Sequence, residues 1–298
     1  MHEQLKTFIR TLDTQQDYAK STCQAYANDL FQFIEFLQTE LGRIPKVTDF
    51  TSETTRNFLE VERKAGMKPS TLHRRRVALK HFAQFLFDQN LLDLDIVISV
   101  SQIQENLWKE ISKQKVICLS EKEMTRLIKT ISIENNPRAL RDIAMVTLLF
   151  ESGLSIGALV ALNLSDINLR ESRIRISENR TSGVWISLPE SIDKIKKYLG
   201  NGRPELTQSL SEEAIFVSQM GERITRQGVW QVLRTWGRQA KLRKPLSPRV
   251  LRHTAVRKML VDNKKISEIQ QMLGHQNQLS TRALVRRIKK VCRVKTGG

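Results

Sequence analysis

The residues best suited to chemistry lie near the end of the chain, in the stretch SPRVLRHTAVRKMLVDNKKISEIQQMLGH, residues 247–275. Arg249 and Arg252 are three residues apart at the start of a predicted helix, so they share one helix face. Two guanidiniums beside the free N–H groups of a first helical turn suit a phosphate group. His253 and His275 add two imidazoles to the same stretch. The pattern predicts a phosphate-binding site.

The positive charge of the chain gathers around this site. The formal net charge is +18, and residues 221–298 hold 20 Lys and Arg against 3 Asp and Glu. The counts are balanced elsewhere, at 16 against 15 in residues 1–115 and 13 against 13 in residues 116–220. Apolar periodicity within the basic quarter indicates a folded surface rather than a tail. Such a surface favours a polyanion as partner, most plausibly nucleic acid, over a generally basic solvated surface.

Further residues are candidate contacts of that polyanion. Arg226 and Gln227 open another predicted helix, and a helix in the first hundred residues carries a basic side with Arg74, Arg75 and Lys80. Each arginine could instead be an ordinary solvated residue, and His253 and His275 could be hydrogen-bonded core residues. Three tryptophans are more typical of a core than of base stacking, namely Trp185, Trp230 and Trp236.

The first hundred residues are predicted to form a helical domain. Tyr26, Leu30, Phe33, Ile34 and Leu37 recur at spacings of three and four within a helix over 21–41. Further helices are predicted over 54–65 and from Pro69 onward, and no alternating pattern typical of strands occurs. Periodicity weakens over 90–115, which predicts domain 1–100, a linker over 101–117 and a second domain over 118–298.

The second domain is predicted to be mostly helical with a small β-sheet. Ser120 and Glu123 form a capping box, and an apolar helix over 138–152 should end at Gly153. Alternating or β-branched residues at 172–177 and 183–188 predict a hairpin. A short strand is expected over 214–217, and helices over 192–199, 225–239, 248–262 and 267–273.

The cysteine content and the apolar runs argue against several classes of protein. Cys23, Cys118 and Cys292 are odd in number and far apart, which argues against a disulfide framework or a cysteine-rich metal site. We expect no metal and no cofactor. No signal segment or apolar run long enough for a membrane span is recognised, so the expected location is cytoplasmic, associated with the nucleoid, without a membrane partner.

The pattern L-R-H-T-A followed by L-G-H resembles the active-site region of tyrosine recombinases, the family of phage integrases and Xer proteins. The resemblance extends over most of the chain, in STCQAYANDLFQFIEFL (21–37), STLHRRRVALKHFAQFL (70–86), ESGLSIGALVALNLSDINL (151–169) and ERITRQGVWQVLRTWGRQAKL (222–242). It implies an N-terminal helical core-binding (SAM-like) domain and a mixed α/β catalytic-type domain that together clamp duplex DNA. In that family a tyrosine attacks the scissile phosphate, while arginines, a lysine and histidines stabilise charge and move protons.

The residues that the family uses for cleavage are largely replaced here. Its first arginine corresponds to Ser155 and the nearby glutamate to Ala158. The hairpin turn over 177–183 has no lysine, and Glu178 stands at the lysine position. Arg249 replaces the first histidine.

The nucleophile is the decisive position. The family's tyrosine should lie about nine residues beyond His275, where this chain has Leu284, and no tyrosine follows Tyr198. Of the catalytic residues that the resemblance implies, Arg252 and His275 remain. We therefore expect a protein that binds DNA without cleaving it, a pseudoenzyme that acts as a regulator, an architectural factor or an inactive partner in DNA recombination and integration.

Two alternatives stay open. The chain could be an active site-specific recombinase with a rearranged site, using Ser280, Thr281 or a nucleophile from a partner protomer. It could also be a protein-interaction remnant that binds DNA weakly. The C-terminal segment places Leu284, Ile288 and Val291 at helical spacing. It could pack on a second copy or on an active recombinase, or lie on DNA phosphates.

Overall fold

The computed structural model describes residues 1–14, 20–103, 116–176, 183–207, 212–274 and 278–292. The chain divides into two compact units, Met1–Gln114 and Lys115–Gly298, and each is described by itself. The first unit contains helices α1 (His2–Thr14), α2 (Lys20–Leu41), η1 (Val47–Asp49), α3 (Ser52–Lys64), α4 (Pro69–Asp88) and α5 (Leu94–Gln102). The predicted linker 101–117 lies mainly outside the described residues.

Aromatic side chains hold the first unit together. The predicted helix face of α2 is buried throughout, and Phe33 makes edge contacts with Phe50 at 5.2 Å and Phe58 at 5.3 Å between ring centroids. Such pairs add to the stabilisation that burial itself provides. The first unit is therefore a helical bundle around an aromatic core, as the periodicity predicted. Helix α5 was not predicted, because its residues show little helical periodicity.

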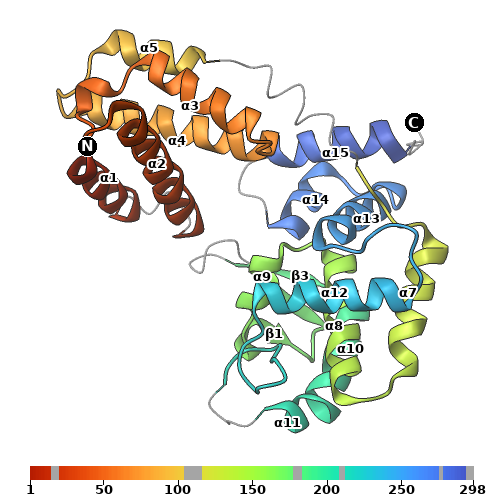
Figure 1. Cartoon of the computed structure of the whole chain (residues 1–298). Coiled ribbons are helices and arrows are strands. Elements are labelled where there is room, and N and C mark those ends of the chain that lie inside the picture. The colour runs from red at the N-terminus through yellow and green to blue at the C-terminus, as the bar shows by residue number, and fades with distance from the viewer. Residues whose placement is uncertain (15–19, 104–115, 177–182, 208–211, 275–277, 293–298) are drawn as a thin grey trace. The chain divides into compact units, whose positions relative to one another are not determined.

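The second unit surrounds α8, whose residues are mostly buried and which packs against α7, α10 and α13 (Figure 1). Its elements are α7 (Glu121–Ile133), α8 (Pro137–Ser152), α9 (Ile156–Ala161), η2 (Leu164–Asp166), β1 (Ile167–Asn168), β2 (Arg173–Ile176), β3 (Val184–Ser187), α10 (Pro189–Asn201), α11 (Arg203–Leu206), α12 (Arg226–Gln239), α13 (Pro248–Val261), α14 (Ile266–Leu273) and α15 (Gln278–Cys292). The fold is mostly helical with a small sheet, as predicted.

The sheet is antiparallel, in the order β1-β2-β3. Its β2–β3 pairing confirms the predicted hairpin, whereas the turn residues 177–182, with Glu178, lie outside the described residues. The strand predicted over 214–217 is wrong. Ala214 and Val217 make only isolated bridges, to Asn163 and Arg223, and the two residues between them bend, so this segment is a loop with too few partners for a ladder.

Two of the three tryptophans predicted to be core residues are exposed. Trp185 is 43% exposed on β3 and Trp230 is 46% exposed on α12, while Trp236 is buried at 7%. The exposed indoles lie beside guanidiniums, with Arg175 5.9 Å from the Trp185 ring and Arg234 6.0 Å from the Trp230 ring. Cation–π contact of this kind lets an indole face remain at the surface.

A buried ion pair ties α8 to α12. Arg141 donates to the Asp142 carboxylate, through Nε at 2.8 Å, and through Nη1 to the Val217 carbonyl at 3.0 Å. The Trp236 indole N–H donates to the other Asp142 oxygen at 2.8 Å. Burial raises the pKa of Asp142, and Arg141 opposes that rise. The three side chains form one mutually satisfied buried group.

We predict that Arg141→Ala strongly destabilises the second unit, because it leaves the Asp142 carboxylate buried without its guanidinium. Breaking such a pair costs about 3–5 kcal/mol. Urea unfolding followed by tryptophan fluorescence measures the loss. Arg126→Ala, which removes an exposed arginine from α7, is the control and should change stability by less than about 0.5 kcal/mol. Equal effects of the two substitutions would contradict the assignment.

Candidate phosphate-binding site

Arg252 on α13 is fixed by two carbonyl groups at the ends of other helices. Its Nη1 donates to the Gly153 carbonyl at 2.7 Å, and its Nη2 lies 3.5 Å from the Leu273 carbonyl. Gly153 ends α8 and Gly274 ends α14, both in the left-handed conformation with φ near +68° and +69°. The guanidinium is therefore oriented before any ligand arrives, which lowers the entropic cost of binding an anion.

Position 153 accommodates little other than glycine. A Cβ built on it would lie 2.7 Å from Leu273 Cδ2 and 3.4 Å from the Ala255 Cβ. Positive φ and this close packing together exclude larger residues. Helices α8, α13 and α14 therefore meet at one point, and that point carries the carbonyl that holds Arg252.

Ser155, which the resemblance places at the family's first arginine position, caps a helix. Its Oγ accepts a hydrogen bond from the Ala158 N–H at 3.1 Å, at the start of α9. A different guanidinium lies near it, because a Cβ on Gly157 would be 2.8 Å from Nη2 of Arg226. The segment 153–157 thus has Arg252 at one end and Arg226 at the other.

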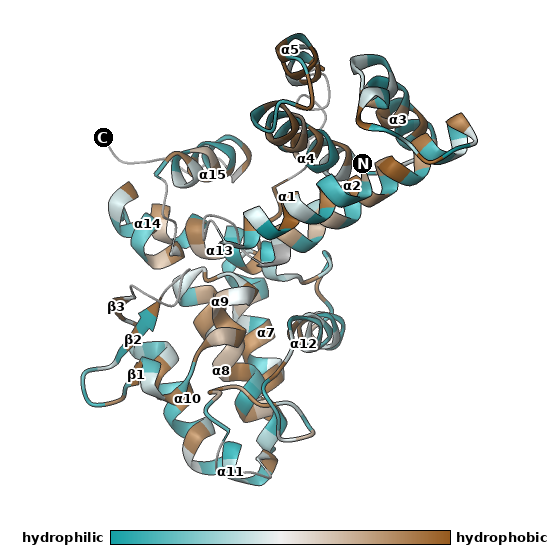
Figure 2. Ribbon diagram, turned by 90° about the vertical axis from the view of Figure 1, so that its left-hand side faces the viewer, coloured by the Kyte–Doolittle hydropathy of each residue, from teal (hydrophilic) through white to brown (hydrophobic). Residues whose placement is uncertain are grey.

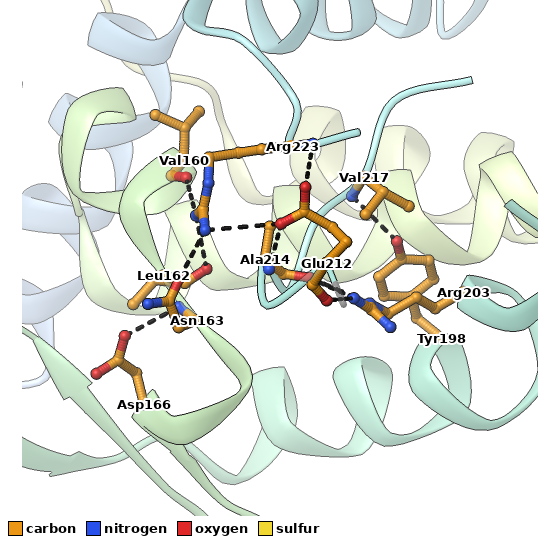
Figure 3. A network of polar contacts seen from close by, with 10 residues as sticks. All are labelled: Val160, Leu162, Asn163, Asp166, Tyr198, Arg203, Glu212, Ala214, Val217 and Arg223. Carbon is orange, nitrogen blue, oxygen red and sulfur yellow. Dashed lines mark hydrogen bonds and ion pairs between the residues drawn. The ribbon is translucent and has the colours of Figure 1, made fainter. Parts of the chain in front are cut away.

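A polar network holds the loop that leads into α12 (Figure 3). Arg223 Nη1 donates to the carbonyls of Val160 at 2.8 Å and Leu162 at 3.2 Å, which lie in and just after α9. The Glu212 carboxylate accepts the backbone N–H groups of Ala214 and Arg223 at 2.7 and 3.1 Å. The start of α12, with Arg226 and the exposed Gln227, is thereby tied to α9.

The tyrosines that the structure describes are core residues. Tyr198 is fully buried, stacks on Phe216, and its hydroxyl accepts from the Val217 N–H at 3.3 Å. Burial raises the pKa of Tyr198, which opposes formation of a phenolate. Tyr26 is buried in the first unit, and Tyr18 lies outside the described residues.

His253 lies inside the second unit, on the same helix as Arg249 and Arg252. The side chain is buried and hydrogen-bonds the backbone of Ile117. Burial first, then the charges of Arg249, Arg287 and Arg252, lower the pKa of His253 to about 4. The imidazole is thus neutral at neutral pH. Its burial favours a hydrogen-bonded core residue over the direct DNA contact that the sequence suggested.

Arg249 and Arg287 bring like charges together at this site. Arg249 is exposed at the start of α13, and partial desolvation together with the charge of Arg287 on α15 lowers its pKa. Arg287 was missed in the sequence because its relation to Arg249 depends on how α15 packs against α13. The one available signal was its position three residues after Leu284, on the same helix face.

Helix α15 packs its apolar residues inward. Val285 and Ile288 are buried, and Leu284 is half-buried against the same core. Thr281 is fully buried, whereas Ser280 is exposed. In Figure 2 the ribbon of α15 carries both hydrophilic and hydrophobic residues, as an amphipathic helix should. His275 lies outside the described residues.

Among the first unit's candidates, Arg75 is corrected to a core residue. Its side chain is 9% exposed, pairs with Glu62 at 2.5 Å and Asp29 at 3.5 Å, and lies over the Phe58 ring. A guanidinium held in this way has little freedom to reach a phosphate. Arg74 also pairs with Asp29 but is 41% exposed, and Lys80 is exposed on α4.

The family models match in two parts of the chain. Residues 118–289 match the model described as "Phage integrase family", and residues 5–90 match "Phage integrase, N-terminal SAM-like domain". The chain belongs to the phage integrase family. This confirms the tyrosine recombinase resemblance and the predicted fold class.

Similar proteins include Tyrosine recombinase XerD of Halalkalibacterium halodurans, 27% identical over 92% of this chain and 90% of that protein. Tyrosine recombinase XerC of Roseiflexus castenholzii is 29% identical over 92% and 86%. Similar solved structures include XerH site-specific recombinase bound to palindromic difH substrate, with TM-score 0.70, 16% identity and coverage of 91% and 79%. The Tn1549 transposon integrase with a circular intermediate DNA has TM-score 0.72, 12% identity and coverage of 98% and 99%.

No cluster of metal-ligating side chains occurs within the described ranges. No described helix is both long and apolar enough to cross a membrane.

We predict that His253 makes folding stability depend on pH between about 6.5 and 4. Its pKa is lower in the folded than in the unfolded chain, so the unfolded state binds the proton first and stability falls as pH falls. About 2 kcal/mol should be lost between pH 7.5 and 5.0. Urea unfolding at both pH values measures this loss. His253→Gln should lack that part of the loss, and an unchanged pH dependence in this variant would contradict the prediction.

Proposed function

We propose that this protein binds duplex DNA through a recombinase-type phosphate site and does not cleave it. One observation carries the proposal: Arg252 is held in a fixed orientation beside Arg249, while the adjacent helix α15 contains leucine, valine and no tyrosine. The site thus keeps groups that attract a phosphate without the group that attacks it.

The positive charge of the C-terminal quarter and the similarity to recombinases both support DNA binding. Lys and Arg contacts to phosphates supply most of the sequence-independent affinity of DNA-binding proteins. Arg226, Arg249 and Arg252 lie on helices of the quarter of the chain that carries nearly all of the excess positive charge. The relatives named above are recombinases, and the similar XerH and Tn1549 integrase structures have a palindromic difH substrate and a circular intermediate DNA bound.

Absence of cleavage is supported by several independent replacements. The pentacoordinate transition state carries extra negative charge, and one preorganised donor to such charge is worth about 3–4 kcal/mol. Ser155 uses its side chain to cap α9. Arg249 replaces a titratable histidine with a guanidinium, which stays charged at neutral pH and is a poor proton donor.

Substitute nucleophiles are poorly placed for attack. Thr281 is fully buried, and Ser280 is exposed in the first turn of α15 with a side chain much shorter than tyrosine. Loss of the nucleophile removes the covalent route altogether. A role as regulator, architectural factor or inactive partner of an active recombinase requires binding alone, and we assign the protein to that class.

We predict that the purified full chain binds duplex DNA with a steep salt dependence. Arg252→Gln should weaken binding roughly tenfold or more, because a hydrogen bond to a charged group contributes about 1.5–3 kcal/mol. Fluorescence anisotropy over a salt series measures both quantities. Lys196→Gln, an exposed charge on α10, is the control and should bind as wild type does. Absence of binding at low salt would end the proposal.

We predict no covalent protein–DNA adduct on a nicked suicide substrate. Denaturing electrophoresis resolves the adduct, and a relative such as an active Xer recombinase on its own site serves as positive control. An adduct formed by the wild-type chain would instead establish the alternative of a rearranged active site. Its loss in Ser280→Ala or Thr281→Val would identify the nucleophile.

A further inference from the structure

Helix α15, on which the resemblance places the family's tyrosine, carries Arg287 near the proposed phosphate site. Arg287 lies on α15 one turn after Leu284 and is half-buried, while its neighbours Val285 and Ile288 anchor the helix to the core. Helix α15 packs directly against α13, which carries Arg249, Arg252 and His253. Arg287 therefore lies beside the buried face of α15, close enough to α13 for its charge to act on Arg249 and His253.

We propose that Arg287 is a third guanidinium ligand of this site and, with Arg249 and Arg252, clamps one intact phosphate diester of duplex DNA. The inference rests on the proposed function and deepens it, because it assigns a binding task to the helix that relatives use for attack. The ligand chemistry is a phosphate oxyanion, supplied either by the DNA backbone or by free inorganic phosphate.

Two helices carry the cluster, and this geometry supports the proposal. Arg249 and Arg252 are one turn apart on α13, and Arg252 is oriented by the Gly153 carbonyl. Arg287 approaches from α15. Planar guanidiniums arriving from two directions suit a phosphate diester, since each of its two non-bridging oxygens can accept hydrogen bonds from more than one N–H donor.

The electrostatics of the neighbouring groups point the same way. Three guanidiniums lower the pKa of His253, in the order Arg249, Arg287 and Arg252, and Arg287 also lowers the pKa of Arg249. Like charges gathered in this way repel one another, and a bound phosphate dianion or diester would relieve that repulsion. Arg286, the preceding residue, has an exposed side chain on the outer side of α15.

Arg287→Gln and Arg286→Gln form a matched pair for the test. Both remove one charge from adjacent positions of the same helix, and both keep a long polar side chain that α15 tolerates. Thermal melts establish that each variant folds. Arg287→Lys is a third variant, which keeps the charge and loses the planar fork.

DNA binding is measured by anisotropy with the full chain across a salt series. We expect Arg287→Gln to weaken binding of duplexes of any sequence roughly tenfold and to reduce the slope of log K against log salt by about 1. Arg286→Gln should weaken binding less than twofold, and Arg287→Lys should fall between wild type and Arg287→Gln. Equal losses in the Arg286 and Arg287 variants would overturn the inference while leaving the proposed function intact.

The His253 ring supplies a readout that needs no DNA. In NMR titrations, Arg287→Gln should raise the pKa of His253, because one repelling charge is gone, and Arg286→Gln should leave it unchanged. Inorganic phosphate added to the wild type should also raise it if free phosphate enters the site, and should do so less in Arg287→Gln. A rise with DNA alone would assign the site to the DNA backbone.

Failure of the two proposals is thus distinguishable. If wild type does not bind duplex DNA, the proposed function fails whatever His253 does. If wild type binds DNA but Arg287→Gln changes neither affinity, salt slope nor the His253 titration, the third guanidinium is refuted and the two-arginine site remains.

Discussion

The second unit depends on a single junction at Gly153. Its left-handed conformation ends α8, its missing side chain admits Leu273 and Ala255, and its carbonyl accepts the hydrogen bond that orients Arg252. Packing and polar chemistry meet in this one residue. A side chain there would separate α8 from α14 and α13, and would displace the acceptor from Arg252 as well. A substitution at Gly153 would therefore disturb both the packing of these helices and the candidate phosphate site.

The remaining polar structure serves to place helices around that junction. The buried Arg141–Asp142–Trp236 group fixes α12 on α8, and Arg223 with Glu212 fixes the loop before α12 on α9. These charged groups are matched with partners inside the protein. Arg249, Arg252 and Arg287 belong to the proposed ligand site instead: Arg287 lowers the pKa of Arg249, and all three lower the pKa of His253. A phosphate bound beside them would offset this accumulation of positive charge.

Sequence alone predicted the features that depend on local pattern. The buried face of α2, the capping box at Ser120 and the glycine end of α8 follow from spacing and backbone preference, which a short window contains. The exposure of Trp185 and Trp230 could not be predicted, since hydrophobicity does not say which face of an element meets solvent. The burial of Arg75 was equally hidden, because Asp29 comes from another helix 46 positions earlier. Arg287 required knowledge of how α15 packs on α13.

The arginine at position 249, where the resemblance implies a histidine, gives a physical reason to connect the two parts of the proposed function, DNA binding and the absence of cleavage. A histidine can donate or accept a proton near neutral pH, and arginine cannot, but arginine remains charged even where water is partly excluded. Catalysis requires interactions that strengthen in the transition state, whereas a permanent charge beside a phosphate stabilises the ground state as well. If Leu284 and Arg249 stand at the tyrosine and histidine positions, as the resemblance implies, both replacements act in the same direction. Each puts a side chain that takes no part in proton transfer or attack where a reactive group would be, which is the change that the proposed binding of an intact phosphate diester requires.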